Sequence, residues 1–165
     1  MADTTPTLPV KGSGVPVGQV NSRGGFPMIP YSLLDHTADL GIRVSGNSLK
    51  DLFKNAGLAL FDLMVLQKCR NKGIKRQLRV IGLDPPDLLV NWLRELLNLW
   101  SLEGRIATTL EIQTMDECSL SATVETVVFD SRQDEINHDI KAVTYHGVDV
   151  QSIAGQWKAT VIFDV

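Results

Sequence analysis

The segment LLVNWLRELLNLW, residues 88–100, constrains the fold more than any other part of the sequence. Its apolar side chains recur every three or four residues, which is the period of one face of an α-helix. They form one broad stripe of Leu88, Leu89, Trp92, Leu93, Leu96, Leu97 and Trp100. The preceding Asp84-Pro85-Pro86-Asp87 predicts a chain break and a helix start, with Asp87 capping the first free amides. This stretch therefore predicts an amphipathic helix over 88–100.

A second helical pattern lies earlier in the chain. Ser48 followed by Asp51 resembles a capping box, with Asp in place of the usual Glu or Gln, and predicts a helix that runs to about Met64. Its inner side carries Leu49, Leu52, Phe53, Ala56, Ala59, Leu60 and Leu63. Two helices of this kind bury their stripes against each other or against a sheet.

Strand patterns fill the remainder of the chain beyond residue 30. Residues 40–45 alternate between apolar and polar or small side chains, and residues 74–82 alternate between apolar and basic ones. From Arg105 onward, the segments TTLEIQTM, SLSATVETVVF, IKAVTYHGVDVQS and QWKATVIFDV are rich in Val, Ile and Thr. This order predicts an α+β fold, with two helices packed on a largely antiparallel β-sheet.

The first 30 residues have a different composition. They contain five of the seven prolines and show almost no periodic apolar pattern. We therefore expect a flexible Pro/Gly-rich N-terminal tail over residues 1–30 and one compact domain over residues 31–165.

Composition limits the class of function. The net charge of −3 offers no global positive field for nucleic acid or an anionic membrane, so we expect any RNA to be reached through a partner. Two cysteines are too few for a disulfide scaffold, which favours a cytoplasmic protein. No apolar run approaches the roughly 20 residues of a membrane helix, and no signal peptide is recognisable, so we expect no membrane partner.

Two groups of acidic residues are candidates for a metal site. Asp39 lies in DHTADLGIRVSG, directly before a predicted strand, and Asp164 lies next to the carboxylate of Val165. Adjacent oxygen anions repel each other unless a cation offsets them, and hard divalent cations favour such ligands. Spacing alone favours two ordinary surface aspartates over a metal site.

Other polar residues are open to two interpretations. His36 is either a structural histidine, the favoured interpretation, or a proton shuttle or ligand, while Thr37 either bonds the local backbone or positions Asp39. Lys141 and His146 either lie on a solvated strand face, again favoured, or meet a phosphate or an acidic partner surface. No GxSxG, GxxxxGK[ST] or HExxH motif is present, which argues against an ordinary hydrolase.

Three blocks of sequence, taken together, resemble the archease family from about Tyr31 to Val165. They are YSLLDHTADLGIRVSGNSLKDLFKNAGLALFDLM, LLVNWLRELLNLW, and IKAVTYHGVDV followed by the final WKATVIFDV. The resemblance implies a compact α+β, cytoplasmic, non-enzymatic activator of an RtcB-type RNA ligase. Such an activator promotes guanylylation of the ligase and its multiple turnover in tRNA splicing and RNA repair.

The resemblance also implies a site. Asp39, Asp164 and the carboxylate of Val165 match the family's ligands for a divalent metal ion, for which we expect Ca²⁺, with Mn²⁺ or Mg²⁺ as alternatives. His36, Thr37, Lys141 and His146 then support the site or face the ligase.

This sequence departs from the family at one place. Members often carry a Gly-Glu pair before KAVTYH, whereas this chain reads VVFDSRQDEINHDI. Either Asp130 or Asp134 substitutes for that carboxylate, or the chain contacts its ligase differently. The alternative function is a metal-dependent phosphoesterase or nucleotide hydrolase that uses the same carboxylates. It lacks a general base or nucleophile beyond His36 and His146.

Overall fold

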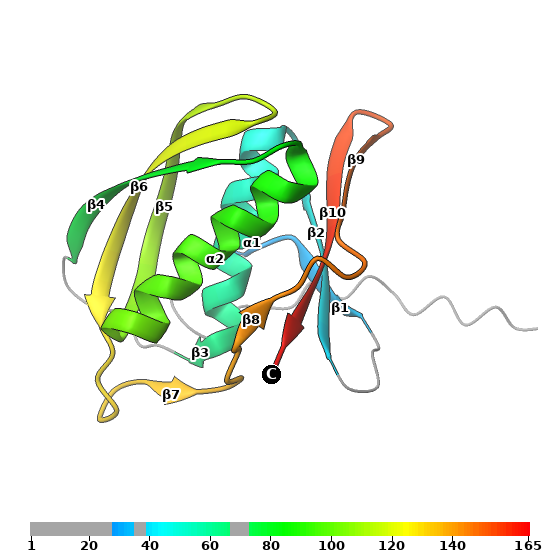
Figure 1. Cartoon of the computed structure of the whole chain (residues 1–165). Helices are drawn as coiled ribbons and strands as arrows, with labels where there is room; N and C mark the ends of the chain where they lie inside the picture. The colour runs from blue at the N-terminus through cyan, green and yellow to red at the C-terminus, as the bar shows by residue number, and fades with distance from the viewer. Residues whose placement is uncertain (1–27, 35–38, 67–72) are drawn as a thin grey trace, which may run out of the picture.

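The computed structural model describes residues 28–34, 39–66 and 73–165 (Figure 1). In chain order the elements are β1 (Tyr31–Leu34), β2 (Leu40–Gly46), α1 (Leu49–Met64), β3 (Val65–Leu66), β4 (Ile74–Ile81), α2 (Pro85–Glu103), β5 (Arg105–Met115), β6 (Ser119–Val128), β7 (Glu135–Ile136), β8 (Ala142–Val143), β9 (Asp149–Ile153) and β10 (Gln156–Asp164).

The strands form two main sheets, and all of their pairings are antiparallel. One sheet has the order β1-β2-β10-β8, with β9 also paired to β10, and the other has the order β4-β6-β5. The short strands β3 and β7 pair separately. The predicted α+β class is therefore confirmed, with the strands divided between sheets instead of joined in one.

Both helices lie between the two main sheets (Figure 1). Helix α1 contacts β2 of one sheet and β5 of the other, while α2 contacts β4, β5 and β8. The fully buried Trp92 joins the helices, because its Nε1 donates a 3.0 Å hydrogen bond to the Phe53 carbonyl. This bond satisfies the polar atom of a large aromatic side chain inside the core.

The start of α1 agrees with the sequence. Ser48 is the N-cap, and its hydroxyl accepts a 3.0 Å hydrogen bond from the amide of Asp51. The helix ends at Met64, as its apolar pattern predicts.

The start of α2 corrects the sequence prediction. The helix begins at Pro85, and the capping residue is Asp84 rather than Asp87. Prolines tolerate the first helical turn because the amides they lack have no intrahelical partner there. Asp84 accepts a 2.9 Å hydrogen bond from the Asp87 amide, and Asp87 accepts one of 2.8 Å from the Leu83 amide. The helix also extends beyond residue 100, to Glu103, where Gly104 adopts a left-handed conformation.

The N-terminal tail stays a prediction. Residues 1–27 lie outside the described residues, and Ile29, at the end of the predicted tail, is buried in the core. Among the described helices, neither is long and apolar enough to cross a membrane.

Candidate functional site

The register between β2 and β10 places two predicted site residues at the same end of the sheet. The pairs run from Trp157 opposite Gly46 to Phe163 opposite Leu40. Asp39 directly precedes β2, so extending this register by one step would set it opposite Asp164. On the other side of β10, Asp164 pairs with Ala142 of β8. The Asp164 carbonyl accepts a 2.8 Å hydrogen bond from the Lys141 amide.

This geometry brings like charges together. Directly opposite residues of an antiparallel pair project to the same face, with Cβ atoms about 4.5–5.5 Å apart. Asp39 and Asp164 are both exposed, and neither side chain has a hydrogen bond or ion pair with the described part of the chain. The carboxylate of Val165 follows directly. We call this cluster of Asp39, Asp164 and the Val165 carboxylate the carboxylate end.

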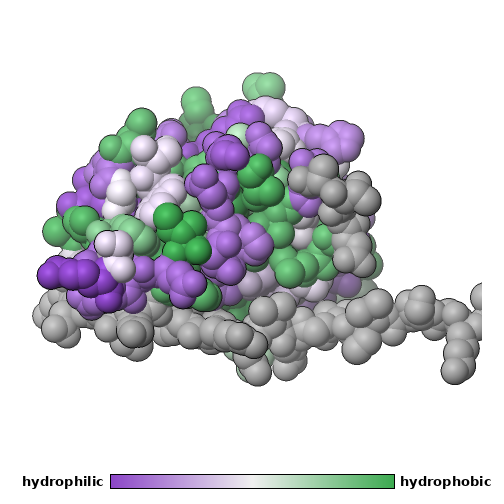
Figure 2. All heavy atoms as spheres, turned by 90° about the horizontal axis from the view of Figure 1, so that it is seen from below, coloured by the Kyte–Doolittle hydropathy of each residue, from purple (hydrophilic) through white to green (hydrophobic). Residues whose placement is uncertain are grey.

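The donor chemistry of the carboxylate end suits a hard divalent cation, because all of its candidate ligands are oxygen anions. A third side-chain ligand is missing from the residues described: they contain no group of three or more His, Cys, Asp or Glu that could hold a metal ion. Figure 2 views the end at which β10 terminates, where hydrophilic and hydrophobic side chains are interspersed.

The other predicted residues differ in how they relate to this end. Lys141 belongs to it through its backbone bond to Asp164, and its side chain is exposed. His146 is exposed in the turn between β8 and β9, and within the described ranges no hydrogen bond or ion pair joins it to the aspartates. His36 and Thr37 lie outside the described residues, so their supporting roles stay predictions.

The turn that carries His146 packs over the sheet. The Thr144 amide and hydroxyl both donate to the Ile162 carbonyl, at 3.1 and 3.2 Å. Gly147, with φ of 64°, lies so close to Ile162 that an added Cβ would be 3.1 Å from the Ile162 Cδ1 atom. Because this turn covers Ile162, the side chain is buried even though it projects from the opposite face of β10 to the core residue Phe163.

A polar cluster between α2 and β8 was not predicted from the sequence. Arg94 donates from Nε and Nη2 to the Val143 carbonyl, at 3.2 and 3.0 Å, and its guanidinium lies 4.7 Å from the centre of the Tyr145 ring. The Tyr145 hydroxyl donates a 2.6 Å hydrogen bond to Asp87. The sequence offered one sign of this cluster, since Arg94 is the single basic residue of α2.

Hydrogen bonding in this cluster shifts two pKa values. The Tyr145 hydroxyl and the Leu83 amide stabilise the ionised Asp87, so the pKa of Asp87 is lowered. The same bond raises the pKa of Tyr145, because loss of the phenolic proton would remove the bond and add a second negative charge.

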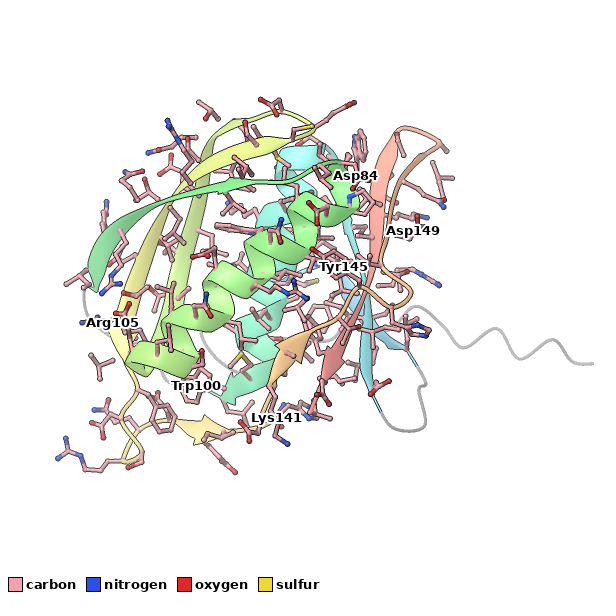
Figure 3. All side chains as sticks on the ribbon, in the orientation of Figure 1. Asp84, Trp100, Arg105, Lys141, Tyr145 and Asp149 are labelled. Carbon is pink, nitrogen blue, oxygen red and sulfur yellow. The ribbon has the colours of Figure 1, made fainter. Side chains whose placement is uncertain are left out.

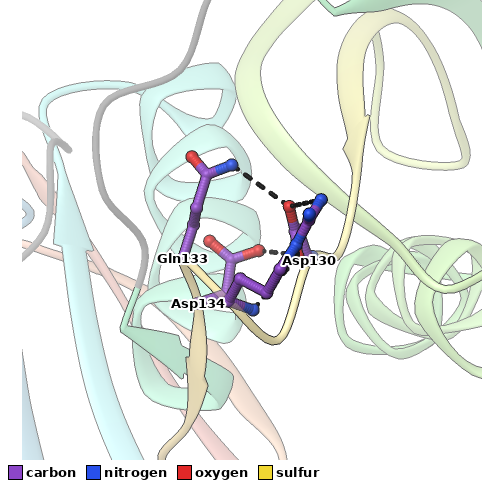
Figure 4. A network of polar contacts seen from close by, with 4 residues as sticks. Asp130, Gln133 and Asp134 are labelled. Carbon is purple, nitrogen blue, oxygen red and sulfur yellow. Dashed lines mark hydrogen bonds and ion pairs between the residues drawn. The ribbon is translucent and has the colours of Figure 1, made fainter.

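Asp130 and Asp134 lie in the loop that departs from the family pattern (Figure 4). Both Asp130 oxygens accept bonds from Arg132, and Oδ2 accepts another from Gln133. These donors lower the pKa of Asp130 well below its usual range. The Asp134 side chain is buried and accepts a 2.8 Å bond from the Asp130 amide. The Asp130 carboxylate thus organises its own loop.

The fold and the carboxylate end define a small α+β protein whose last strand presents acidic groups beside a second aspartate. The chain belongs to the archease family, since the model of the Archease protein family matches residues 31–165. Protein archease of Pyrococcus abyssi is 34% identical over 136 residues, which are 79% of this chain and 95% of that relative. Protein archease of Methanosarcina barkeri is 30% identical over 139 residues, which are 82% of this chain and 95% of that relative.

Two solved structures share the fold. The solution structure of protein 1598 from Methanobacterium thermoautotrophicum is 29% identical and has a TM-score of 0.70, covering 82% of this chain and 98% of its own. The crystal structure of an archease from Thermotoga maritima, described as a possible chaperone, is 22% identical, with a TM-score of 0.57 and coverage of 80% and 94%. The second likeness concerns the fold alone.

Proposed function

We propose that this protein is a non-enzymatic, metal-binding activator of an RtcB-type RNA ligase in the cytoplasm. It promotes guanylylation of the ligase and its multiple turnover in tRNA splicing and RNA repair. The observation that carries the proposal is the pairing of β2 with β10, which brings Asp164 and the start of β2, next to Asp39, to the same end of the sheet in a chain of the archease family.

In this proposal Asp39, Asp164 and the Val165 carboxylate hold a divalent ion, with Ca²⁺ expected and Mn²⁺ or Mg²⁺ as alternatives. The bound ion supplies positive charge that offsets the repulsion among the three carboxylates. Asp39 directly precedes β2 and Asp164 ends the neighbouring strand β10, and the backbone bond from Lys141 to Asp164 ties β8 to the same end. His36, Thr37, Lys141 and His146 support this end or face the ligase, and RNA is reached through the ligase.

The test is a guanylylation assay with the ligase of the same organism. Wild-type protein should accelerate guanylylation, while Asp39→Asn and Asp164→Asn should remove the gain and lower Ca²⁺ affinity in calorimetry. Glu111→Gln, an exposed change of the same charge on β5, serves as the control and should behave like wild type. Full stimulation by both aspartate variants would show that the carboxylate assignment is wrong.

Two further measurements address the third ligand and the alternative function. Residues appended after Val165 should lower metal affinity, because they remove the free carboxylate; unchanged affinity excludes it as a ligand. Incubation of the protein alone with GTP or with RNA ending in a 2',3'-cyclic phosphate should give no turnover. Hydrolysis in the absence of ligase would instead support the alternative hypothesis of a phosphoesterase or nucleotide hydrolase.

A further inference from the structure

A groove runs along the outer side of α2, between β4 and β8. Its volume is about 590 Å³, within the range of small-molecule sites. We call it the α2 groove and define it by six lining residues: Arg79 of β4, Asn91, Arg94, Glu95 and Asn98 of α2, and Lys141 before β8. Figure 3 labels Lys141 and Tyr145, which lie on its β8 side.

The α2 groove concentrates positive charge in a chain whose net charge is −3. Three cations, Arg79, Arg94 and Lys141, line it together with one carboxylate, Glu95. Among the described residues none of the three cations forms an ion pair with a carboxylate, whereas Arg76, Arg105 and Arg132 do. The three cations come from three elements, so the tertiary structure, and no single basic segment, assembles them.

Arg94 is held in place within this groove. Two of its five N–H groups serve the Val143 carbonyl, and its guanidinium lies over the ring of Tyr145, whose hydroxyl is bound by Asp87. The other edge of the Arg94 guanidinium can donate to an anionic oxygen, and because the side chain is already ordered, little further conformational entropy is lost on binding. Phosphate oxygens match that planar donor geometry.

The backbone around the groove argues against an extended peptide as the ligand. Added strands bind through free backbone groups at a sheet edge. Here the Val143 carbonyl already accepts from Arg94, and the Ile81 carbonyl accepts a 3.1 Å bond from Asn91 Nδ2. Two backbone carbonyls of the groove are therefore already engaged, and the three cations and two amide side chains of its lining suit a phosphate with an attached sugar or base.

We propose that the α2 groove binds a phosphate group of a nucleotide or of RNA between Arg79, Arg94 and Lys141. This site shares Lys141 with the carboxylate end but otherwise uses different residues, and it does not depend on the ligase. Arg79 and Arg94 test it best, because Lys141 also contributes its backbone to the carboxylate end.

The experiment measures binding of two probes to the full chain at low salt, GTP by calorimetry and a fluorescent single-stranded oligoribonucleotide by anisotropy. Arg79→Gln and Arg94→Gln should each weaken binding about tenfold, the effect of losing one charge-assisted hydrogen bond of about 1.4 kcal/mol. Lys75→Gln removes the same charge from β4 outside the groove and should change affinity little. Thermal unfolding of each variant shows whether it is folded.

The two probes distinguish the source of the phosphate. Binding of GTP with the expected variant losses supports a nucleotide site. Binding of the oligoribonucleotide alone, with the same variant losses, supports direct contact with an RNA backbone and replaces the proposal that RNA is reached only through the ligase. The proposal is overturned if neither probe saturates, or if Lys75→Gln weakens binding as much as Arg79→Gln does. Asp164→Asn should leave probe binding intact even where it abolishes ligase stimulation, so the two proposals can fail separately.

Discussion

The Tyr145 hydroxyl donates a 2.6 Å hydrogen bond to Oδ1 of Asp87, 58 residues earlier in the chain. This bond fastens the turn after β8 to the first turn of α2, and the Tyr145 ring lies beneath Arg94. The contact therefore links the segment KAVTYH, which carries part of the family resemblance, to the helix that lines the α2 groove.

Tyr145→Phe should raise the pKa of Asp87 toward its ordinary value, because the hydrogen bond from the Tyr145 hydroxyl, which contributes most to lowering it, is lost. A carboxyl whose pKa is depressed in the folded state adds stability at neutral pH, and that stability is lost as the pH falls through its folded pKa. The variant should consequently lose less stability on acidification than wild type. Carbon-detected NMR titration measures the shift. Asp116, whose pKa is lowered by Cys118 and Ser119, is an internal control and should not change.

Asp164→Asn should stabilise the metal-free protein. Like charges directly opposite each other on antiparallel strands are destabilising, and relief of such a pair contributes about 0.2–1 kcal/mol. Urea unfolding in the presence of a chelator measures the gain. Asp149→Asn, on β9 opposite Thr160, provides a control that has no carboxylate across the strand. A loss of stability in Asp164→Asn would contradict the repulsion inferred at the carboxylate end.

Asp84→Ala should destabilise the fold by about 1 kcal/mol, since it removes the side chain that caps α2. Asp84→Asn should retain most of the stability, because its amide oxygen can still accept from the Asp87 amide. The comparison uses the free energy of unfolding in urea. Equal loss in both variants would mean that the charge of Asp84, and not its hydrogen bond, supports the helix.

Tyr31→Phe should cost about 1.5–3 kcal/mol, the range for a hydrogen bond to a charged group. The buried Tyr31 hydroxyl donates a 2.6 Å bond to Asp62, which joins β1 to α1. Burial, and then this bond, raise the pKa of Tyr31 above its ordinary value. A raised pKa gives stability that is present below the unfolded-state pKa of about 10 and is lost as the pH rises through the folded-state value. The difference in the free energy of unfolding between wild type and variant, measured with urea, should therefore become smaller in strong alkali.

Local patterns were sufficient for the helices and for the fold class. The stripes of α1 and α2 and the Ser48 cap depend on neighbours three or four residues apart, so the sequence carries them directly. The same reasoning predicted the wrong cap for α2, Asp87 in place of Asp84, because the two prolines occupy the first helical positions and the cap is the residue before them. Strands β3 and β7 have two residues each, too few for a recognisable alternation.

The sequence by itself determined two amphipathic helices, an α+β class and, through its family resemblance, Asp39 and Asp164 as candidates. Only the tertiary structure decided that these aspartates lie at the same end of one sheet, that the strands split into separate sheets, and that Arg79, Arg94 and Lys141 line one groove. The reason is physical. Periodicity records which face of an element is buried, whereas the choice and register of strand partners depend on contacts between residues far apart in the chain.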